Sequence, residues 1–288
     1  MFKILKKREL TPVTKLFVVS APMVARKAQP GQFVIIRVVP NGERIPLTVA
    51  DADPEAGTVT IVIQEVGKTS RLAGAMDEGD EMLDFVGPLG RPAPLTGKGP
   101  VVLVGGGFGV APIYPIAKAL RAKGVKVISI IGARTEDLLI LSEEMASVSD
   151  ELLVATDDGS RGHHGFVTDV LKQLIDSGRE IEQVIAIGPM VMMRAVGRVT
   201  EPYKLKTLVS VDPIMVDGTG MCGACRLTVG GEVKFACVDG PIFDAHEVDF
   251  DEAVRRGKIY AAEQRLAVEK MEKEQCGGKC ACGCGGGR

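Results

Sequence analysis

Short runs of β-branched and apolar residues recur through the first third of the chain, and clusters of Pro, Gly, Asn and Asp separate them. This spacing is typical of an antiparallel barrel or sandwich. We therefore expect residues 1–97 to form an antiparallel β-barrel with one short helix at 70–76. The expected strands cover 16–20, 33–39, 45–50, 58–65 and 81–86.

From about residue 98 the apolar runs are continuous and alternate with helical segments. Strands that are apolar on both faces and alternate with helices indicate a parallel sheet covered on both sides. Residues 98–211 are thus expected to form a five-stranded parallel α/β domain. The expected strands are 101–104, 125–131, 152–155, 183–187 and 205–209, and the expected helices are 112–123, 136–146, 167–176 and 190–199.

The last part of the chain changes character twice. Residues 212–249 are rich in turn-forming residues and hold three cysteines, which predicts a small metal-binding domain. Residues 250–275 read as one charged terminal helix. The tail 276–288, CGGKCACGCGGGR, has low complexity and no residues that could form a core, so disorder is expected there.

Composition excludes several classes of protein. The net charge is −2, with 45% hydrophobic and 25% charged residues, so nothing favours nucleic-acid binding. Glycines and prolines interrupt the longest uncharged run, 99–117, which argues against a membrane span. All seven cysteines lie after residue 220, and no apolar leader is visible. This pattern favours a cytoplasmic protein with metal or iron–sulfur chemistry over a disulfide scaffold.

A glycine-rich segment, GGGFGVAP, follows the first apolar strand of the second domain and opens a helix. Such glycines let the backbone approach a pyrophosphate, and the helix N-terminus offers free N–H groups. The ends of three further strands, GAR, TDDGS and GPM, would lie at the same sheet edge. A turn without ligand is the alternative, and Arg134 could be a plain surface residue. The candidate nucleotide-binding residues are Gly105, Gly106, Gly107, Gly109, Ala111, Pro112, Ala133, Arg134, Thr156, Asp157, Asp158, Gly159, Gly188, Pro189 and Met190.

Two segments of the barrel carry candidate phosphate or flavin contacts. Arg44, Pro46 and Thr48 fall on one face of a strand because side chains alternate. The segment 67–70, GKTS, starts a short helix and could hold a pyrophosphate. An ordinary barrel edge and a plain helix cap are the alternatives.

The cysteine segment gives the most specific pattern. Cys222 and Cys225 form a C-x-x-C pair in a glycine-rich loop, and Cys237 follows. Three thiolates leave one position open, because zinc and iron–sulfur centres both use four ligands. Zinc therefore remains an alternative metal at this point.

Together, RIPLT, GKTS, GGGFGVAP, TDDGS, GPM and DGTGMCGAC…C resemble the ferredoxin-reductase-like electron-transfer subunits. This family includes the small subunit of NADH-dependent ferredoxin:NADP oxidoreductase (sulfide dehydrogenase) and the electron-transfer subunit of dihydroorotate dehydrogenase B. The resemblance covers residues 1 to about 265 and implies FAD on the barrel, NAD(H) or NADP(H) on the α/β domain and a 2Fe–2S cluster after it.

Carried over by position, the resemblance assigns FAD contacts to Arg44, Pro46, Leu47, Thr48, Ile63, Gln64, Gly67, Lys68, Thr69 and Ser70. Arg44 lies one residue earlier than the arginine of the wider family's flavin motif. Asp217 stands where the dihydroorotate dehydrogenase subunit has its first cluster cysteine, so Asp217, Cys222, Cys225 and Cys237 are the expected iron ligands. A turn role for Asp217, or a tail cysteine as fourth ligand, is the alternative.

These observations predict an electron-transfer flavoprotein subunit that passes electrons between NAD(P)H, FAD and a 2Fe–2S cluster. The expected partner is a larger flavin and iron–sulfur subunit in a heterodimer or higher assembly, with ferredoxin reached through it. No residue is expected to act as a catalytic acid or base, because the cofactors carry the chemistry. The alternatives are the electron-transfer subunit of dihydroorotate dehydrogenase in pyrimidine synthesis, and a zinc-stabilised nucleotide-binding regulator.

Overall fold

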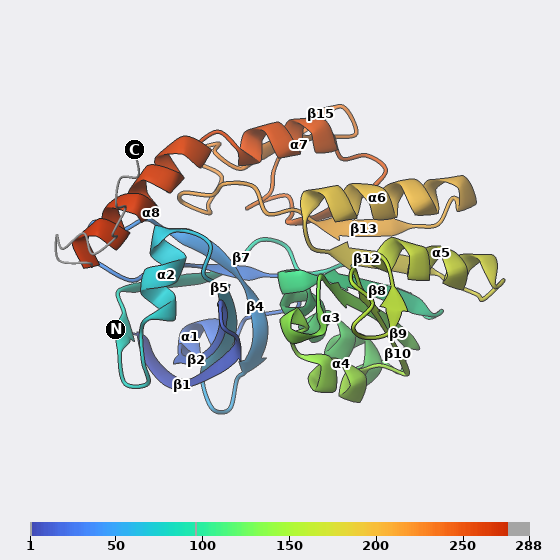
Figure 1. Ribbon diagram of the computed structural model, residues 1–288, viewed down its shortest axis with the longest axis horizontal. Coiled ribbons are helices and arrows are strands. Elements are labelled where there is room, and N and C mark those ends of the chain that lie inside the picture. Colours follow the sequence, from blue (N-terminus) through green and yellow to red (C-terminus); the bar gives the residue numbers. More distant parts are fainter. Residues whose placement is uncertain (1, 96, 276–288) are drawn as a thin grey trace, which may run out of the picture.

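A computed structural model describes residues 2–95 and 97–275 of the chain. A β-barrel and an α/β unit lie side by side, and the C-terminal segment crosses above both (Figure 1). The tail expected to be disordered, 276–288, lies outside the described residues. Within the described residues, no helix is both long and apolar enough to span a membrane.

The barrel confirms the antiparallel fold expected for the N-terminal part. Its seven strands pair in the order β6-β1-β2-β5-β4-β3-β7, and the sheet curls into a nearly closed barrel (Figure 1). Fully buried Phe17, Ile36 and Ile61 lie in its core. The elements are β1 (Phe2–Thr11), β2 (Thr14–Ser20), α1 (Pro22–Ala25), β3 (Phe33–Arg37), β4 (Ile45–Asp53), β5 (Thr58–Gln64), α2 (Lys68–Gly74), β6 (Glu81–Met82) and β7 (Asp84–Leu89).

The second sheet contains all five expected parallel strands, in the order β10-β9-β8-β12-β13. Two short strands extend it: β11 pairs parallel to β10, and β16 pairs antiparallel to β13. The elements are β8 (Val101–Gly106), α3 (Val110–Ala122), β9 (Val127–Ala133), α4 (Ser142–Val148), β10 (Glu151–Thr156), β11 (His163–His164), α5 (Val167–Asp176), β12 (Gln183–Ile187), α6 (Met190–Thr200) and β13 (Thr207–Ser210).

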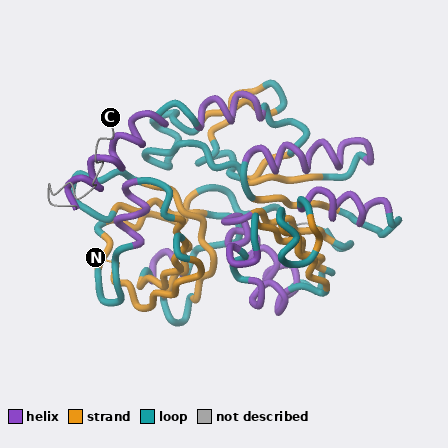
Figure 2. The backbone as a smooth tube through the Cα atoms, viewed as in Figure 1, coloured by secondary structure: helices purple, strands orange, loops and turns teal. Residues whose placement is uncertain are grey.

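Alternation along β8 explains how both faces of this sheet are covered (Figure 2). Val101 and Leu103 pack with α3 and α4, whereas Val102 and Val104 pack with α5 and α6. The helix expected at 136–146 is shorter than predicted. Residues 136–138 form a single 3₁₀ turn, and α4 begins only at Ser142.

The cysteine segment folds onto both larger units. It forms a hairpin of β14 (Arg226–Val229) and β15 (Glu232–Phe235), whose turn residues Gly230 and Gly231 both have positive φ, as a type I′ turn requires. Strand β16 (Ile242–Asp244) then joins the parallel sheet. Cys225, Cys237 and Phe33 of the barrel belong to one core cluster with Val102 of the α/β unit.

The prediction of one terminal helix over 250–275 is wrong. The structure has two helices, α7 (Phe250–Gly257) and α8 (Ala261–Gln275), and the chain turns at Lys258. Gly257 ends the first helix, because glycine has a low helix propensity. Helix α8 crosses to the barrel, where Glu272 forms an ion pair with Arg71 of α2 at 2.6 Å (Figure 1).

Candidate functional site

A cavity of about 1020 Å³ lies where the barrel, the α/β unit and the cysteine segment meet. Its size is at the upper end of the ~300–1,000 Å³ usual for small-molecule sites. Thirteen of the sequence-predicted residues line it: Pro46, Leu47, Thr48, Gln64, Gly106, Gly107, Gly109, Pro112, Ala133, Arg134, Asp157, Gly188 and Pro189.

The glycine loop after β8 is shaped for close approach by a ligand. Gly107 has φ +53°, and a Cβ there would meet no atom within 4 Å, so its backbone faces open space. At Gly109 a Cβ would lie 2.0 Å from the Ile187 carbonyl oxygen, because the loop packs directly on the end of β12. The two glycines thus serve different needs: one leaves room for a ligand and the other allows packing.

The ends of β9 and β10 are tied together beside this loop. The backbone N–H groups of Asp157 and Asp158 donate to the carbonyls of Ala133 and Arg134 at 3.1 and 3.2 Å. Hydrogen bonds from Ser160 lower the pKa of Asp158. The Asp158 carboxylate thereby closes the turn between these two residues. Asp157 and Arg134 remain exposed and line the cavity beside this loop, so both charged groups are accessible to a nucleotide bound there.

Six further nucleotide candidates do not line the cavity: Gly105, Ala111, Thr156, Asp158, Gly159 and Met190. Thr156 is fully buried, and its hydroxyl hydrogen-bonds the backbone of Arg161 at 2.9 Å. Gly105 packs against Val110 and Ile113 of α3. These residues support the shape of the loops instead of facing the ligand space.

On the barrel side, β4 presents Pro46, Leu47 and Thr48 to the cavity. Ile63 of β5 is fully buried in the barrel core and does not line the cavity. Arg44 also lies outside the lining, with its guanidinium 3.9 Å from Asp84.

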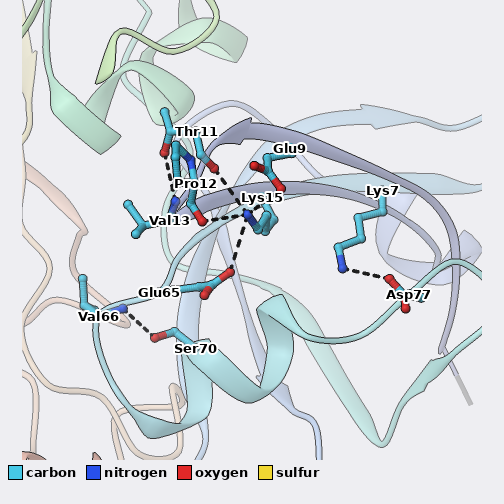
Figure 3. Close-up of polar contacts among 10 residues, drawn as sticks. All are labelled: Lys7, Glu9, Thr11, Pro12, Val13, Lys15, Glu65, Val66, Ser70 and Asp77. Carbon is cyan, nitrogen blue, oxygen red and sulfur yellow. Dashed lines mark hydrogen bonds and ion pairs between the residues drawn. The ribbon is translucent and has the colours of Figure 1, made fainter. Parts of the chain in front are cut away.

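The segment 67–70 does not line the cavity either. The Ser70 hydroxyl accepts the backbone N–H of Val66 at 3.0 Å (Figure 3) and that of Gly67 at 2.9 Å. The Thr69 hydroxyl donates to Glu43 at 2.8 Å. Ser70 thus fixes the start of α2, as the helix-cap alternative describes, whereas Thr69 ties the helix to the segment before β4. Gly67 and Lys68 also lie outside the cavity lining.

Sequence reasoning missed the turn between β1 and β2, where Thr11, Val13 and Thr14 line the cavity. Buried Lys15 fixes this turn (Figure 3). Its ammonium donates to the carbonyls of Thr11 and Pro12 at 3.3 and 2.8 Å and forms ion pairs with Glu9 at 2.9 Å and Glu65 at 3.9 Å. Lys15, four residues after the end of β1, is the sequence feature that could have indicated this turn.

Further missed lining residues are mostly apolar and include Phe33, Phe108, Phe166, Met192, Met215 and Pro241. Asp212 is the charged residue among them. Its side chain is exposed to the cavity, and the protein atoms around the cavity wall partly desolvate the carboxyl, which raises its pKa to about 6. No sequence motif identifies Asp212, because its place in the cavity wall depends on how the end of β13 packs beside the barrel.

The expected iron ligands gather in the cysteine segment. The Sγ atoms of Cys225 and Cys237 are buried and lie 3.2 Å apart. Desolvation, with a hydrogen bond from Cys225, raises the pKa of the Cys237 thiol to about 12. Exposed Cys222 is joined to Asp217 through its backbone N–H, at 3.0 Å from the carboxylate.

The three thiols and one carboxylate are donor types that suit an iron–sulfur or zinc centre. Of these four, only Cys225 and Cys237 already lie close enough together to bind one metal. Two thiolates on one tetrahedral metal, each ~2.3 Å from it, lie roughly 3.7 Å apart, so Cys225 and Cys237 need little movement to share one. Among the described residues, no three His, Cys, Asp or Glu side chains already converge on one point.

Comparison with known proteins identifies the family. A model of the iron–sulfur cluster binding domain of dihydroorotate dehydrogenase B matches residues 212–249, and one of the oxidoreductase NAD-binding domain matches residues 103–198. A dihydroorotate dehydrogenase B (NAD⁺) electron transfer subunit homolog of Thermotoga maritima is 47% identical, covering 94% of this chain and 95% of that protein. This chain belongs to the family of dihydroorotate dehydrogenase B electron transfer subunits and their homologues.

Two other family relatives extend this finding. The electron transfer subunit of Bacillus caldolyticus is 38% identical over 80% of this chain and 90% of its own length. A chain of the solved NADH-dependent reduced ferredoxin–NADP oxidoreductase, studied for flavin-based electron bifurcation, superposes with a TM-score of 0.90 at 46% identity. That match covers 95% of this chain and 98% of the other.

Family membership confirms the sequence-based prediction of an electron-transfer oxidoreductase subunit with a ferredoxin-reductase-like fold. The expected cofactors, FAD, a 2Fe–2S cluster and NAD(P)H, agree with it. Because family members are named as subunits, this chain is one subunit of a larger assembly.

Proposed function

We propose that this chain passes electrons between NAD(P)H, FAD and a 2Fe–2S cluster, and exchanges them with a larger flavin- and iron–sulfur-containing subunit. One observation carries the proposal. The cavity is lined by the glycine loop, by β4 of the barrel, and by Met215 and Pro241 of the cysteine segment. All three binding units therefore border one space, which suits transfer from nucleotide to flavin to cluster.

FAD supplies, when bound, the conversion between hydride transfer and single-electron transfer. The residues of this chain bind and orient the cofactors, and they exclude water from the cavity. The loop around Gly107 receives the nucleotide pyrophosphate, with Arg134 and Asp157 beside its adenosine end. Pro46, Leu47 and Thr48 lie along the flavin, and Met215 and Pro241 close the cavity on the cluster side.

The proposal also names the iron ligands, the functional units and the compartment. The four iron ligands are Asp217, Cys222, Cys225 and Cys237. The functional units are 1–97 for FAD, 98–211 for the nucleotide and 212–249 for the cluster, followed by 250–275. Cysteines used as metal ligands fit a reducing compartment, so we place the protein in the cytoplasm.

Isolation of the native complex tests this function. We expect a yellow-brown complex with flavin and iron, in which the second protein is itself an iron–sulfur flavoprotein. A colourless chain that contains zinc would contradict the proposal and favour a nucleotide-binding regulator. A dihydroorotate dehydrogenase catalytic subunit as partner would favour the second candidate function, which the match to that enzyme's cluster domain supports.

Identification of the flavin is a separate test. We expect chromatography of heat-released flavin to yield FAD, because the cavity is large enough for a dinucleotide beside the glycine loop. Release of FMN alone would contradict this assignment without affecting the cluster.

A further inference from the structure

Helix α7 supports the loop that carries the C-x-x-C pair. The Asp249 carboxylate caps the helix by accepting the Glu252 N–H at 2.8 Å. The Glu252 carboxylate in turn accepts the N–H of Thr228, on the strand that follows Cys225, at 2.8 Å. Phe250 and Ala253 are buried against the core. The helix is therefore held in a fixed position relative to the cluster loop.

The last turn of α7 directs Arg256 toward this loop. Its Nη2 donates to the carbonyl of Ala224, between Cys222 and Cys225, at 3.1 Å. Its Nε is buried and has no hydrogen-bond partner within residues 2–95 and 97–275. Buried donors are almost always satisfied, so an unsatisfied one beside a cofactor loop points to a partner supplied by the bound group or its water.

The positive charge of Arg256 is also not neutralised locally. Among the described residues, no carboxylate lies within 4.0 Å of its guanidinium, whereas Arg194 of α6 is paired with Asp251 at 2.9 Å. Arg226 also reaches the loop, at 3.4 Å from the Gly223 carbonyl, but this side chain is exposed and its charge is screened by water.

We propose that Arg256 is a positioning residue that holds a positive charge against the Cys222–Cys225 loop and thereby raises the reduction potential of the cluster. The proposal rests on the proposed function, because it requires a cluster at these cysteines. Reduction adds one negative charge to the cluster, and a nearby cation in a partly buried site stabilises that charge. Its hydrogen bond also fixes the loop carbonyl between the two ligands.

Redox titration of the full chain, followed by electron paramagnetic resonance, tests this role. The variants are Arg256→Gln, which removes the charge, and Arg256→Lys, which keeps it. Arg255→Gln is the matched control, because it removes the same charge from the same helix turn at an exposed position. We expect a more negative midpoint potential for Arg256→Gln, a smaller shift for Arg256→Lys and no shift for Arg255→Gln.

The outcomes separate the two proposals. A parent chain without a 2Fe–2S signal would contradict the proposed function. A parent with the signal, but with the same potential in Arg256→Gln, would overturn only the role of Arg256. If Arg256→Gln loses its cluster, Arg256→Lys decides: a retained cluster near the parent potential supports the charge, and equal loss contradicts it.

Discussion

The carboxylate of Asp217 accepts the backbone N–H of Cys222 at 3.0 Å. A second hydrogen bond, from the Thr219 N–H at 3.0 Å, lowers the pKa of this carboxyl most strongly. Asp217 is thus ionised at neutral pH, as a metal ligand must be. The same two bonds also close a turn, so one experiment separates the turn role from the ligand role.

We predict that Asp217→Cys keeps a 2Fe–2S cluster but changes its spectrum and potential, and that Asp217→Ala loses or destabilises it. A carboxylate is a harder donor than a thiolate, so exchange of the two alters the iron. Electron paramagnetic resonance and iron analysis provide the measurement.

Asp239→Ala is the matched control for Asp217, because the Asp239 carboxylate also accepts a backbone N–H in this segment, from Phe235 at 2.8 Å. It should keep the parent spectrum. If both Asp217 variants match the parent in spectrum and potential, Asp217 is a turn residue and the fourth ligand lies elsewhere.

Substitution Gly107→Val should weaken nucleotide binding and leave flavin content unchanged. A Cβ at this position projects into the open space of the cavity, where the pyrophosphate is expected. Loss of ~1.4 kcal/mol of phosphate contact would raise the KM for NAD(P)H about tenfold. Stopped-flow reduction of the flavin measures this.

Gly124→Val separates strain from obstruction. Gly124 also has a positive φ, +73°, with open space around it, but it follows α3 and does not line the cavity. Both variants share the strain of a β-branched residue in the left-handed region. Equal nucleotide saturation in the two variants would count against the assigned loop.

The buried ammonium of Lys15 should control flavin retention. Lys15→Met removes the donor to two carbonyls of the turn that lines the cavity, and leaves Glu65 without its partner (Figure 3). We expect a loss of ~1–3 kcal/mol in stability and weaker FAD binding. Urea unfolding and fluorescence titration with FAD measure the two effects.

Lys7→Met is the comparison, since Lys7 pairs with Asp77 at 2.9 Å on the same barrel (Figure 3) and neither residue lines the cavity. An exposed pair of this kind contributes ~0–1 kcal/mol. Unchanged FAD affinity in Lys15→Met would show that the turn is not part of the flavin site.

Asp212 should make the stability of the cofactor-free chain depend on pH. Desolvation raises its folded-state pKa from 3.8 to about 6, so folding favours the protonated form. The free energy of unfolding is therefore highest below pH ~3.8, where both states are protonated, and falls as the pH rises to ~6. Asp212→Asn should therefore be more stable than the parent at pH 7.5, and most of this advantage should be gone at pH 4.5.

Urea unfolding at both pH values measures the difference for Asp212. Asp157→Asn, which removes another carboxylate from the cavity lining, is the control. A stability difference between Asp212→Asn and the parent that is the same at both pH values would contradict the prediction.

The parallel sheet was predictable because its strands are buried on both faces and thus continuously apolar, as in 101–104. Strand β1 was not predictable, because half of its sequence FKILKKRELT is charged and only Ile4 and Thr11 are buried. With β1 the turn to β2 was missed, and so were Thr11, Val13 and Thr14 of the cavity.

The site was predictable where backbone shape matters. Gly107 and Gly109 carry their signal in the residue type itself, since only glycine meets both demands. Arg44 and Ser70 illustrate the opposite case. Their phosphate contacts stay predictions: in the structure the Arg44 guanidinium lies 3.9 Å from Asp84, and the Ser70 hydroxyl accepts two backbone N–H groups. Asp212 depends on tertiary contacts alone.

The antiparallel strand β16 has a consequence for any attempt to divide this chain. Through its pairs Leu208↔Asp244 and Ser210↔Ile242, it covers the outer edge of β13. A fragment that ended at residue 211 would leave that edge open, next to buried Val209. Open edges recruit strands from other molecules, so such a fragment would tend to aggregate. The cysteine segment therefore also acts as the edge protection of the nucleotide domain.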